Sequence, residues 1–251
     1  MRTFLGIGLG PIQTGIFLLG GQKNFDRMVV ADVDAELVEK VRRAKGVISI
    51  NIAEKNRVVA KKIDGLEIFN PAEPSDIEKL VKAASEADEI CTALPSVKFF
   101  DKIATWLKKG FALQPERQRL VYTAENHNHA AEILSEKIGS SDAKIFFLNT
   151  VIGKMSGIVP AGECESRKLE KLTPDCSKGH LVEEFNKILI SECPGIENRK
   201  VAGLTVKKNL LPFEEAKLYG HNAVHFLLGI HASEKGLSYM QELSKDRKSV
   251  V

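Results

Sequence analysis

The stretch Phe4-Leu-Gly-Ile-Gly8-Leu-Gly10-Pro-Ile-Gln-Thr-Gly15 decides the fold that the sequence predicts. Its apolar start suits a buried strand, closely spaced glycines follow, and the residues after them have the apolar spacing of a helix. The next predicted strand ends at Asp32, 24 residues after Gly8. A strand, a glycine-rich turn, a helix and an acidic residue after the second strand are the context in which Gly-x-Gly-x-x-Gly carries structural meaning.

This turn predicts a dinucleotide site. Gly8 permits a tight turn, and Gly10 lets the backbone approach a pyrophosphate at the N-terminus of a helix that begins near Pro11 and Ile12. Asp32 would accept hydrogen bonds from the adenosine ribose. Because no Arg follows it closely, NAD is favoured over NADP.

The third position of the pattern is Gln13, and Gly15, two residues later, is a candidate to replace the missing glycine in helix packing. Two alternatives stay open for this segment: an adenosyl site of the methyltransferase kind and a purely structural turn. Asp32 is also compatible with a surface carboxylate at a strand end.

Short apolar runs alternate with amphipathic stretches, which predicts an α/β fold with a Rossmann-type, doubly wound, mostly parallel sheet. We expect strands over residues 3–9, 27–32, 89–93, 119–123 and 144–148, and helices over 12–19, 35–43, 74–85, 97–108 and 129–138. Residues 47–51, 57–63 and 65–69 interrupt the alternation as a small meander. These features predict an NAD-binding domain over 1–150.

Residues 151–251 are expected to form a smaller, mainly helical substrate and catalytic domain. Glycines and prolines are spread through its first part, and beyond them residues 181–190 suit a helix or a strand. Residues 212–230 predict a helix, because Pro212 suits the first turn and acidic residues follow it.

Composition excludes several classes of protein. A net charge of +3 does not suggest a nucleic-acid partner, and no apolar run is long enough for a membrane span or typical of a signal peptide. The four cysteines form no CxxC pair, which is typical of reduced thiols in the cytoplasm. We expect a cytoplasmic protein without a metal, since the scattered Cys164, Cys176 and His180 fit no standard metal-ligand spacing.

The predicted C-terminal helix carries a polar stripe. At about 100° per residue, with Lys217 at zero, His221, His225 and Asn222 fall near 40°, 80° and 140°. By itself such a stripe is compatible with a solvated surface.

Lys217, Asn222 and His225 match the Lys-x4-Asn-x2-His signature of the polyol-specific long-chain dehydrogenases, which the chain resembles. Other landmarks fall in the family's order along residues 1–239. They are the glycine turn, Asp32, the segment Ile90-Cys-Thr-Ala93-Leu94-Pro95, the pair Glu125-Asn126, and Asn149 in Phe147-Leu-Asn-Thr-Val-Ile-Gly-Lys154. Departures are Gln13, the missing glycine near Leu94, and Gly153-Lys154 in place of Asp-Arg.

The resemblance implies an NAD-dependent oxidoreductase that interconverts a polyol or polyol phosphate and the corresponding ketose, without a metal. Lys217 would be the general base, Asn149 and Asn222 would donate to the developing alkoxide, and His225 would orient the substrate. It also implies cofactor contacts at Gly8, Gly10, Pro11, Ile12, Gln13, Gly15, Asp32, Ala93, Leu94, Glu125 and Asn126.

Other functions stay open. One is a hexuronate reductase, and another is a dinucleotide-binding regulatory protein with weakened turnover. Family members usually continue into a longer helical domain beyond the Lys-Asn-His helix. We therefore expect a minimal second domain, a truncated product, or a partner chain that closes the cleft, with a homo-oligomer as one possibility.

Overall fold

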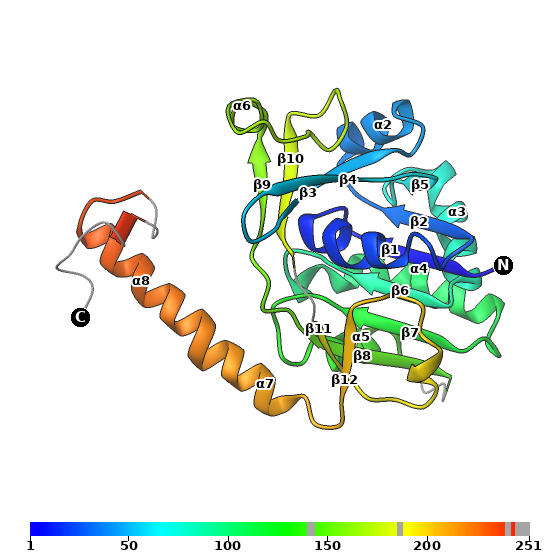
Figure 1. Cartoon of the computed structure of the whole chain (residues 1–251). Helices are drawn as coiled ribbons and strands as arrows, with labels where there is room; N and C mark the ends of the chain where they lie inside the picture. The colour runs from blue at the N-terminus through cyan, green and yellow to red at the C-terminus, as the bar shows by residue number, and fades with distance from the viewer. Residues whose placement is uncertain (140–143, 185–187, 239–241, 244–251) are drawn as a thin grey trace. The chain divides into compact units, whose positions relative to one another are not determined.

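The computed structural model describes residues 1–139, 144–184, 188–238 and 242–243. The chain divides into two compact units, Met1–Lys208 and Asn209–Val251. In Figure 1 the first unit runs from blue to yellow and the second from orange to red.

The first unit is built on a large sheet that confirms the predicted fold class. Its order is β5-β2-β1-β6-β7-β8-β11-β12. The six strands from β5 to β8 are parallel, while β11 is antiparallel to β8. This is the doubly wound order in which ligands bind at the carboxyl ends of the strands. The bounds are β1 (Thr3–Ile7), β2 (Arg27–Ala31), β5 (Leu66–Phe69), β6 (Glu89–Thr92), β7 (Arg119–Thr123), β8 (Ile145–Val151), β11 (Ile188–Ser191) and β12 (Leu204–Lys207).

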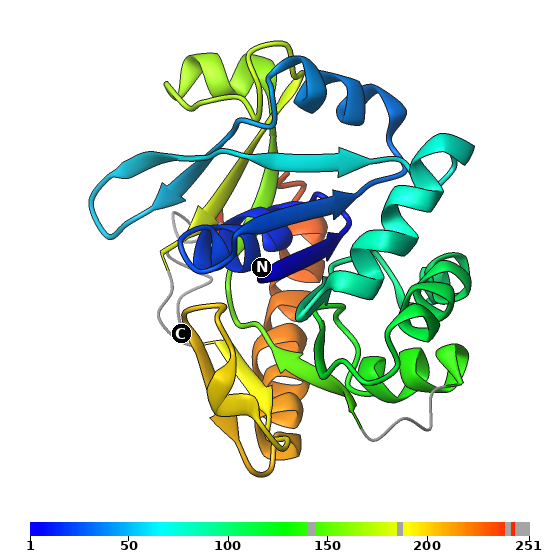
Figure 2. The same ribbon diagram turned by 90° about the vertical axis from the view of Figure 1, so that its right-hand side faces the viewer.

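Helices cover both faces of this sheet (Figure 2). Successive residues of β1 point to opposite faces, so Phe4 packs in one apolar cluster with Phe17, and Leu5 packs in a second cluster with Leu80. The first cluster includes the π-helix η1 (Gln13–Leu18) and α2 (Ala35–Arg43), with α1 (Leu19–Gly21) following η1. The second includes α3 (Pro74–Glu86), α4 (Phe100–Leu113) and α5 (Ala130–Ile138), with the short η2 (Val97–Phe99) before α4.

A second, smaller sheet has the order β4-β3-β10-β9. Its strands are β3 (Ile48–Ala53), β4 (Val58–Ile63), β9 (Ser156–Pro160) and β10 (Lys178–Glu183), and α6 (Ala161–Ser166) follows β9. The predicted three-stranded meander is wrong in its last member. β5 pairs with β2 in the large sheet, where Leu66 and Ile68 are buried in the same cluster as Met28 and Val30.

The helical part of the chain begins later than the sequence suggested. The predicted boundary after residue 150 falls inside β8, and the two compact units divide at Lys208 and Asn209. The first unit extends past residue 150 because β10 pairs with β3 in the small sheet and β11 pairs with β8 in the large sheet. Of the ambiguous residues 181–190, 181–183 therefore fall in β10 and 188–190 in β11, while 185–187 lie outside the described residues. The short η3 (Ile196–Asn198) leads to β12.

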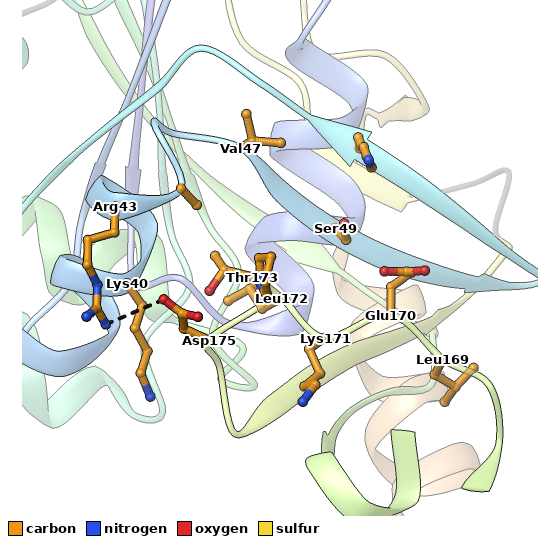
Figure 3. A pocket seen from close by; sticks show the side chains of 13 residues that line it. Lys40, Arg43, Val47, Ser49, Leu169, Glu170, Lys171, Leu172, Thr173 and Asp175 are labelled. Atoms are coloured by element: carbon orange, nitrogen blue, oxygen red, sulfur yellow. Dashed lines mark ion pairs between the residues drawn. The ribbon is translucent and has the colours of Figure 1, made fainter. Parts of the chain in front are cut away.

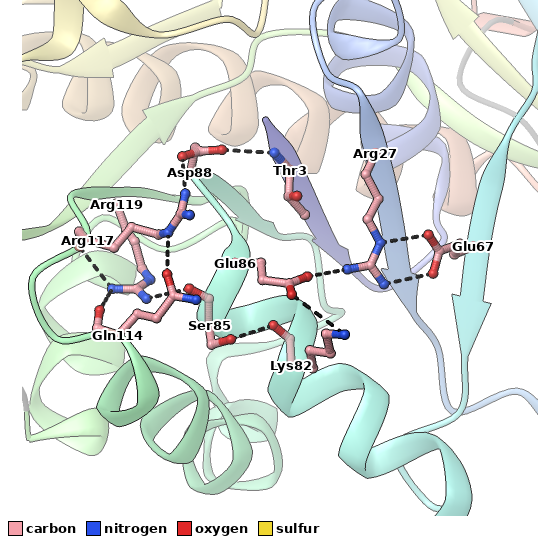
Figure 4. Close-up of polar contacts among 10 residues, drawn as sticks. All are labelled: Thr3, Arg27, Glu67, Lys82, Ser85, Glu86, Asp88, Gln114, Arg117 and Arg119. Carbon is pink, nitrogen blue, oxygen red and sulfur yellow. Dashed lines mark hydrogen bonds and ion pairs between the residues drawn. The ribbon is translucent and has the colours of Figure 1, made fainter. Parts of the chain in front are cut away.

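Polar contacts hold the end of the sheet where the parallel strands begin (Figure 4). Arg27 at the start of β2 bonds Glu67 of β5 at 2.7 Å and Glu86 of α3 at 2.6 Å. Arg119 at the start of β7 is fully buried, and its guanidinium donates to the carbonyls of Ala84, Ser85, Gln114 and Arg117. These contacts fix the strands at one end and leave their carboxyl ends for binding.

The second unit confirms the predicted helix over 212–230. α7 (Leu211–Glu215), the π-helix η4 (Ala216–Asn222) and α8 (Ala223–Glu234) follow one another without a break. Large apolar side chains are exposed along it, including Tyr219, Val224, Phe226 and Leu227. Among the described residues, the helices are too short or too polar to cross a membrane.

Candidate functional site

The glycine turn connects β1 to η1 at the carboxyl edge of the large sheet. Gly8 has φ +89° and its N–H donates to Ala31 O at 2.8 Å. A Cβ on Gly8 would lie 2.7 Å from Ala93 O, so any side chain here is excluded both by conformation and by space. A Cβ on Gly10 would meet no atom within 4 Å. The backbone is therefore open at Gly10, where a pyrophosphate would approach.

Asp32 follows β2 and fixes this turn. Its Oδ2 accepts from Leu9 N at 2.7 Å, and its Oδ1 accepts from Asp34 N at 2.9 Å. Asp34 in turn is the N-cap of α2 and accepts from Leu37 N at 3.0 Å. One carboxylate therefore ties the end of β2 to the turn after β1, in addition to any ribose hydroxyl it accepts.

Gln13 lies behind the turn and is fully buried. Its amide covers Gly6 of β1, where a Cβ would lie 2.2 Å from Gln13 Nε2. In the usual pattern a third glycine in the helix lets the helix pack closely on the strand. Here the helix has Gln13 at that position, and Gly6 of the strand makes room for its side chain. Gly15 is also packed, since its Cβ would lie 2.8 Å from Val182 of β10, while Pro11 and Ile12 are half-buried at the start of the helix.

The loop after β6 faces the glycine turn and is held by Glu125. Thr92 Oγ1 donates to Glu125 Oε2 at 2.8 Å, and Leu94 N donates to Oε1 at 2.9 Å. Burial raises the pKa of Glu125, against the lowering effect of these hydrogen bonds. Asn126 lies next to it, exposed in the loop before α5.

A cleft of about 240 Å³ brings five of the predicted cofactor residues together: Gly8, Gly10, Asp32, Ala93 and Leu94. The same cleft is also lined by Ile158 of β9 and Lys178 of β10. Sequence reasoning missed these two, because no local pattern shows that a strand more than a hundred residues downstream returns to the turn.

Asn149 lies near the carboxyl end of β8 and is buried. Its Oδ1 accepts from Ala131 N at 2.9 Å and its Nδ2 donates to Glu132 Oε2 at 2.9 Å, so the amide also holds the start of α5. Nδ2 carries two hydrogens, and the bond to Glu132 uses one of them.

In the second unit, the π-helical turn coincides with the predicted polar residues. Lys217 and Asn222 lie in η4 and His225 lies in α8. The stripe angles calculated for a regular α-helix therefore do not apply across η4, whose hydrogen bonds run from i to i+5. The rings of His221 and His225 are neighbours, with centroids 4.2 Å apart. Burial lowers the pKa of the half-buried Lys217, which is the direction that a general base requires.

A separate pocket of about 520 Å³ lies at the C-terminal end of α2, away from the N-cap Asp34 (Figure 3). It is lined by Lys40 and Arg43 of α2, Lys62 of β4 and Lys171 of the loop before β10, with Asp175 3.8 Å from Arg43. None of the predicted site residues lines it. Among the residues that the structure describes, no three His, Cys, Asp or Glu side chains are grouped to hold a metal ion.

The strand order, the glycine turn and Asp32 define the first unit as a dinucleotide-binding fold of the Rossmann dehydrogenase type. The particular proteins that the chain is similar to are mannitol-1-phosphate 5-dehydrogenases. It is 25% identical to the one from Caldanaerobacter subterraneus subsp. tengcongensis over 98% of this chain and 62% of that protein. It is 27% identical to the one from Arthrobacter sp. strain FB24 over 96% of this chain and 61% of that protein.

These similarities confirm the resemblance to the polyol-specific long-chain dehydrogenases. The chain spans about three fifths of the length of these curated relatives, 62% and 61% of the two proteins above. No protein-family model matches it.

Solved structures share the fold at low identity. A ternary complex of Pseudomonas fluorescens mannitol 2-dehydrogenase with NAD and D-mannitol has a TM-score of 0.63 at 10% identity, covering 86% of this chain and 55% of that one. A substrate-free D-sorbitol dehydrogenase has a TM-score of 0.62 at 12% identity, covering 85% and 55%.

Proposed function

We propose that the chain is part or all of an NAD-dependent oxidoreductase that interconverts a polyol or polyol phosphate and the corresponding ketose. One observation carries the proposal: the glycine turn, held by Asp32, faces Ala93 and Leu94 across one cleft at the carboxyl ends of β1, β2 and β6. The similarity to mannitol-1-phosphate 5-dehydrogenases over nearly the whole chain supports the substrate class.

The residues present fit a dinucleotide. Space is open above Gly10 for a pyrophosphate, and Asp32 is placed for the adenosine ribose. Exposed or half-buried apolar side chains of the cleft, among them Val33, Pro71 and Ile158, would contact the adenine. When bound, NAD would accept the hydride of the substrate's carbinol carbon and return it in the reverse reaction.

Lys217 is proposed as the general base that takes the hydroxyl proton of the substrate. An ordinary lysine is protonated near neutral pH, and a lowered pKa increases the fraction of free amine. Asn222 and Asn149 are proposed to donate amide N–H bonds to the developing alkoxide, and His225 to orient a neighbouring hydroxyl. None of these roles needs a metal.

Two measurements on the whole chain test the proposal. Fluorescence titration with NADH reports binding, and NADH absorbance reports turnover with mannitol 1-phosphate, mannitol, sorbitol and hexuronates. We expect NADH binding and oxidation of mannitol 1-phosphate or mannitol. Turnover only with hexuronates would replace the substrate class, binding without turnover would indicate a regulatory protein, and no binding would reject the function.

A further inference from the structure

The small sheet reaches the adenosine end of the cleft through one lysine. Lys178 at the start of β10 lines the cleft with Asp32 and Asp34, and its Nζ lies 3.6 Å from Asp34 Oδ2. Among the described residues that line this cleft, Lys178 is the only lysine or arginine. The charges next to the end of β2 are therefore two carboxylates and one ammonium group.

The position of Lys178 is fixed by the residues that follow it. Side chains two apart on a strand share a face, so Lys178, His180 and Val182 lie on one face of β10. His180 Nδ1 lies 3.0 Å from Thr14 Oγ1, and Val182 packs against Gly15. Both contacts hold β10 against the helix that follows the glycine turn, and this places the backbone of Lys178 beside the cleft.

The other residues are arranged so that Asp34 and Lys178 are available to a ligand. Each carboxylate oxygen of Asp32 accepts one backbone N–H, from Leu9 or Asp34, and has a second lone pair for a ribose hydroxyl. Asp34 Oδ1 caps α2, and Oδ2 faces Lys178. The side chains of Asp34 and Lys178 are 46% and 29% exposed, so a bound group can reach them.

From this arrangement we infer that Lys178 is a cofactor-specificity residue. Its ammonium contacts the adenosine ribose end of the dinucleotide and offsets one of the two carboxylates. The cleft therefore repels a 2′-phosphate less than the two carboxylates alone would, and NADPH also binds, more weakly than NADH. The inference rests on the proposed dinucleotide function. It assigns the choice between NAD and NADP to Asp32, Asp34 and Lys178 together, where the sequence pattern assigned it to Asp32 and the absence of an Arg close after it.

The test compares the dissociation constants of NADH and NADPH for the full chain and its variants. Lys178→Met keeps an unbranched side chain of similar length and removes the charge. We expect it to weaken NADPH by about fivefold, as for one partly exposed ion pair, and NADH by less than about twofold. Lys178→Arg should retain NADPH binding. Thermal unfolding of each variant shows whether it is folded.

Two further variants separate this effect from a general change of charge. Lys171→Met removes a lysine from the loop before β10, but that residue lines the pocket at the other end of α2 (Figure 3) and should change neither affinity. Asp34→Asn keeps an equally good N-cap and removes one carboxylate from the cleft, so it should strengthen NADPH binding. Lys178→Met should likewise weaken adenosine 2′,5′-bisphosphate more than AMP when each competes with NADH. That result would place the effect of Lys178 in the adenosine half of the dinucleotide.

Each outcome decides the inference. If Lys178→Met weakens both dinucleotides equally, or neither, Lys178 has no specificity role. If the wild type binds NADH but no measurable NADPH, the ammonium does not offset the carboxylates and the inference is also wrong. If the wild type binds neither dinucleotide, the proposed function itself is rejected.

Discussion

The side-chain amide of Gln13 occupies the space that a Cβ on Gly6 would need, with Nε2 2.2 Å from that position. We predict that Gly6→Ala lowers the free energy of unfolding by about 1 to 3 kcal/mol, the usual cost of overpacking. Gln13→Ala in the same chain should recover most of this loss, because it vacates the space. Thermal or denaturant unfolding of both single variants and the double variant measures the coupling. Additive losses would show that the two residues do not compete for space.

Asp32 is expected to matter for NADH in two ways, through the ribose and through Leu9. Asp32→Asn should weaken NADH about tenfold or more, the range of hydrogen bonds to a charged group. Asp26→Asn is a matched control, since Asp26 bonds the backbone of Arg2 at the other end of the sheet. Fluorescence titration distinguishes them, and equal affinities for all three proteins would remove Asp32 from the cofactor site.

Thr14 links the glycine turn to the small sheet. Its hydroxyl lies 3.2 Å from Gly10 O and 3.1 Å from Pro11 O, and 3.0 Å from His180 Nδ1. Burial lowers the pKa of His180 to about 4, so the ring is neutral near pH 7. Thr14→Val should destabilise the protein by about 1 to 3 kcal/mol, because it leaves a buried ring nitrogen unpaired, and should also weaken NADH.

Thr14→Ser keeps the hydroxyl and should restore both properties. Thr3→Val is the control, because Thr3 Oγ1 is buried in the described structure without a hydrogen-bond partner. If Thr14→Val lowers stability but leaves the NADH affinity of the remaining folded protein unchanged, the contact with His180 is structural only.

We predict that Glu125 makes the free energy of unfolding depend on pH. Burial raises its pKa in the folded protein above the ordinary value of 4.5. As pH rises from 4.5 towards that raised pKa, the unfolded chain releases the proton first, so the folded state loses stability. Above the folded pKa the loss is complete. The melting temperature of the wild type relative to Glu125→Gln should therefore fall over this window, and parallel curves for the two proteins would contradict the raised pKa.

Lys217→Ala should reduce polyol oxidation by a factor of about 10² to 10⁴, as for loss of a general base, with NADH affinity nearly unchanged. In the wild type the oxidation rate should rise with pH through a pKa below the 10.5 of an ordinary lysine. Lys235→Ala, a lysine just after α8, is the control. Wild-type rates in Lys217→Ala at neutral pH would exclude this residue as the base.

The sequence predicted the doubly wound sheet because local signals are strong there. Residues 35–43 and 119–123 have the bounds that α2 and β7 show. The role of Gly6, the place of β5 and the return of β10 to the turn depend on contacts between distant segments, which no local pattern encodes. The π-helical turn at Lys217 was missed for a related reason, because a periodicity of 3.6 residues was assumed throughout.

The contacts of β10 with Thr14 and Gly15 have a consequence for biosynthesis. A ribosome emits the glycine turn long before Val182, at about 5 to 20 residues per second. When β8 is complete, the nascent chain has β1, β3 and β6, which pack on η1, but it lacks the β10 residues His180 and Val182 that contact Thr14 and Gly15. A fragment ending at residue 150 should therefore acquire its nucleotide-binding shape poorly, and productive folding should wait until β10 has left the exit tunnel.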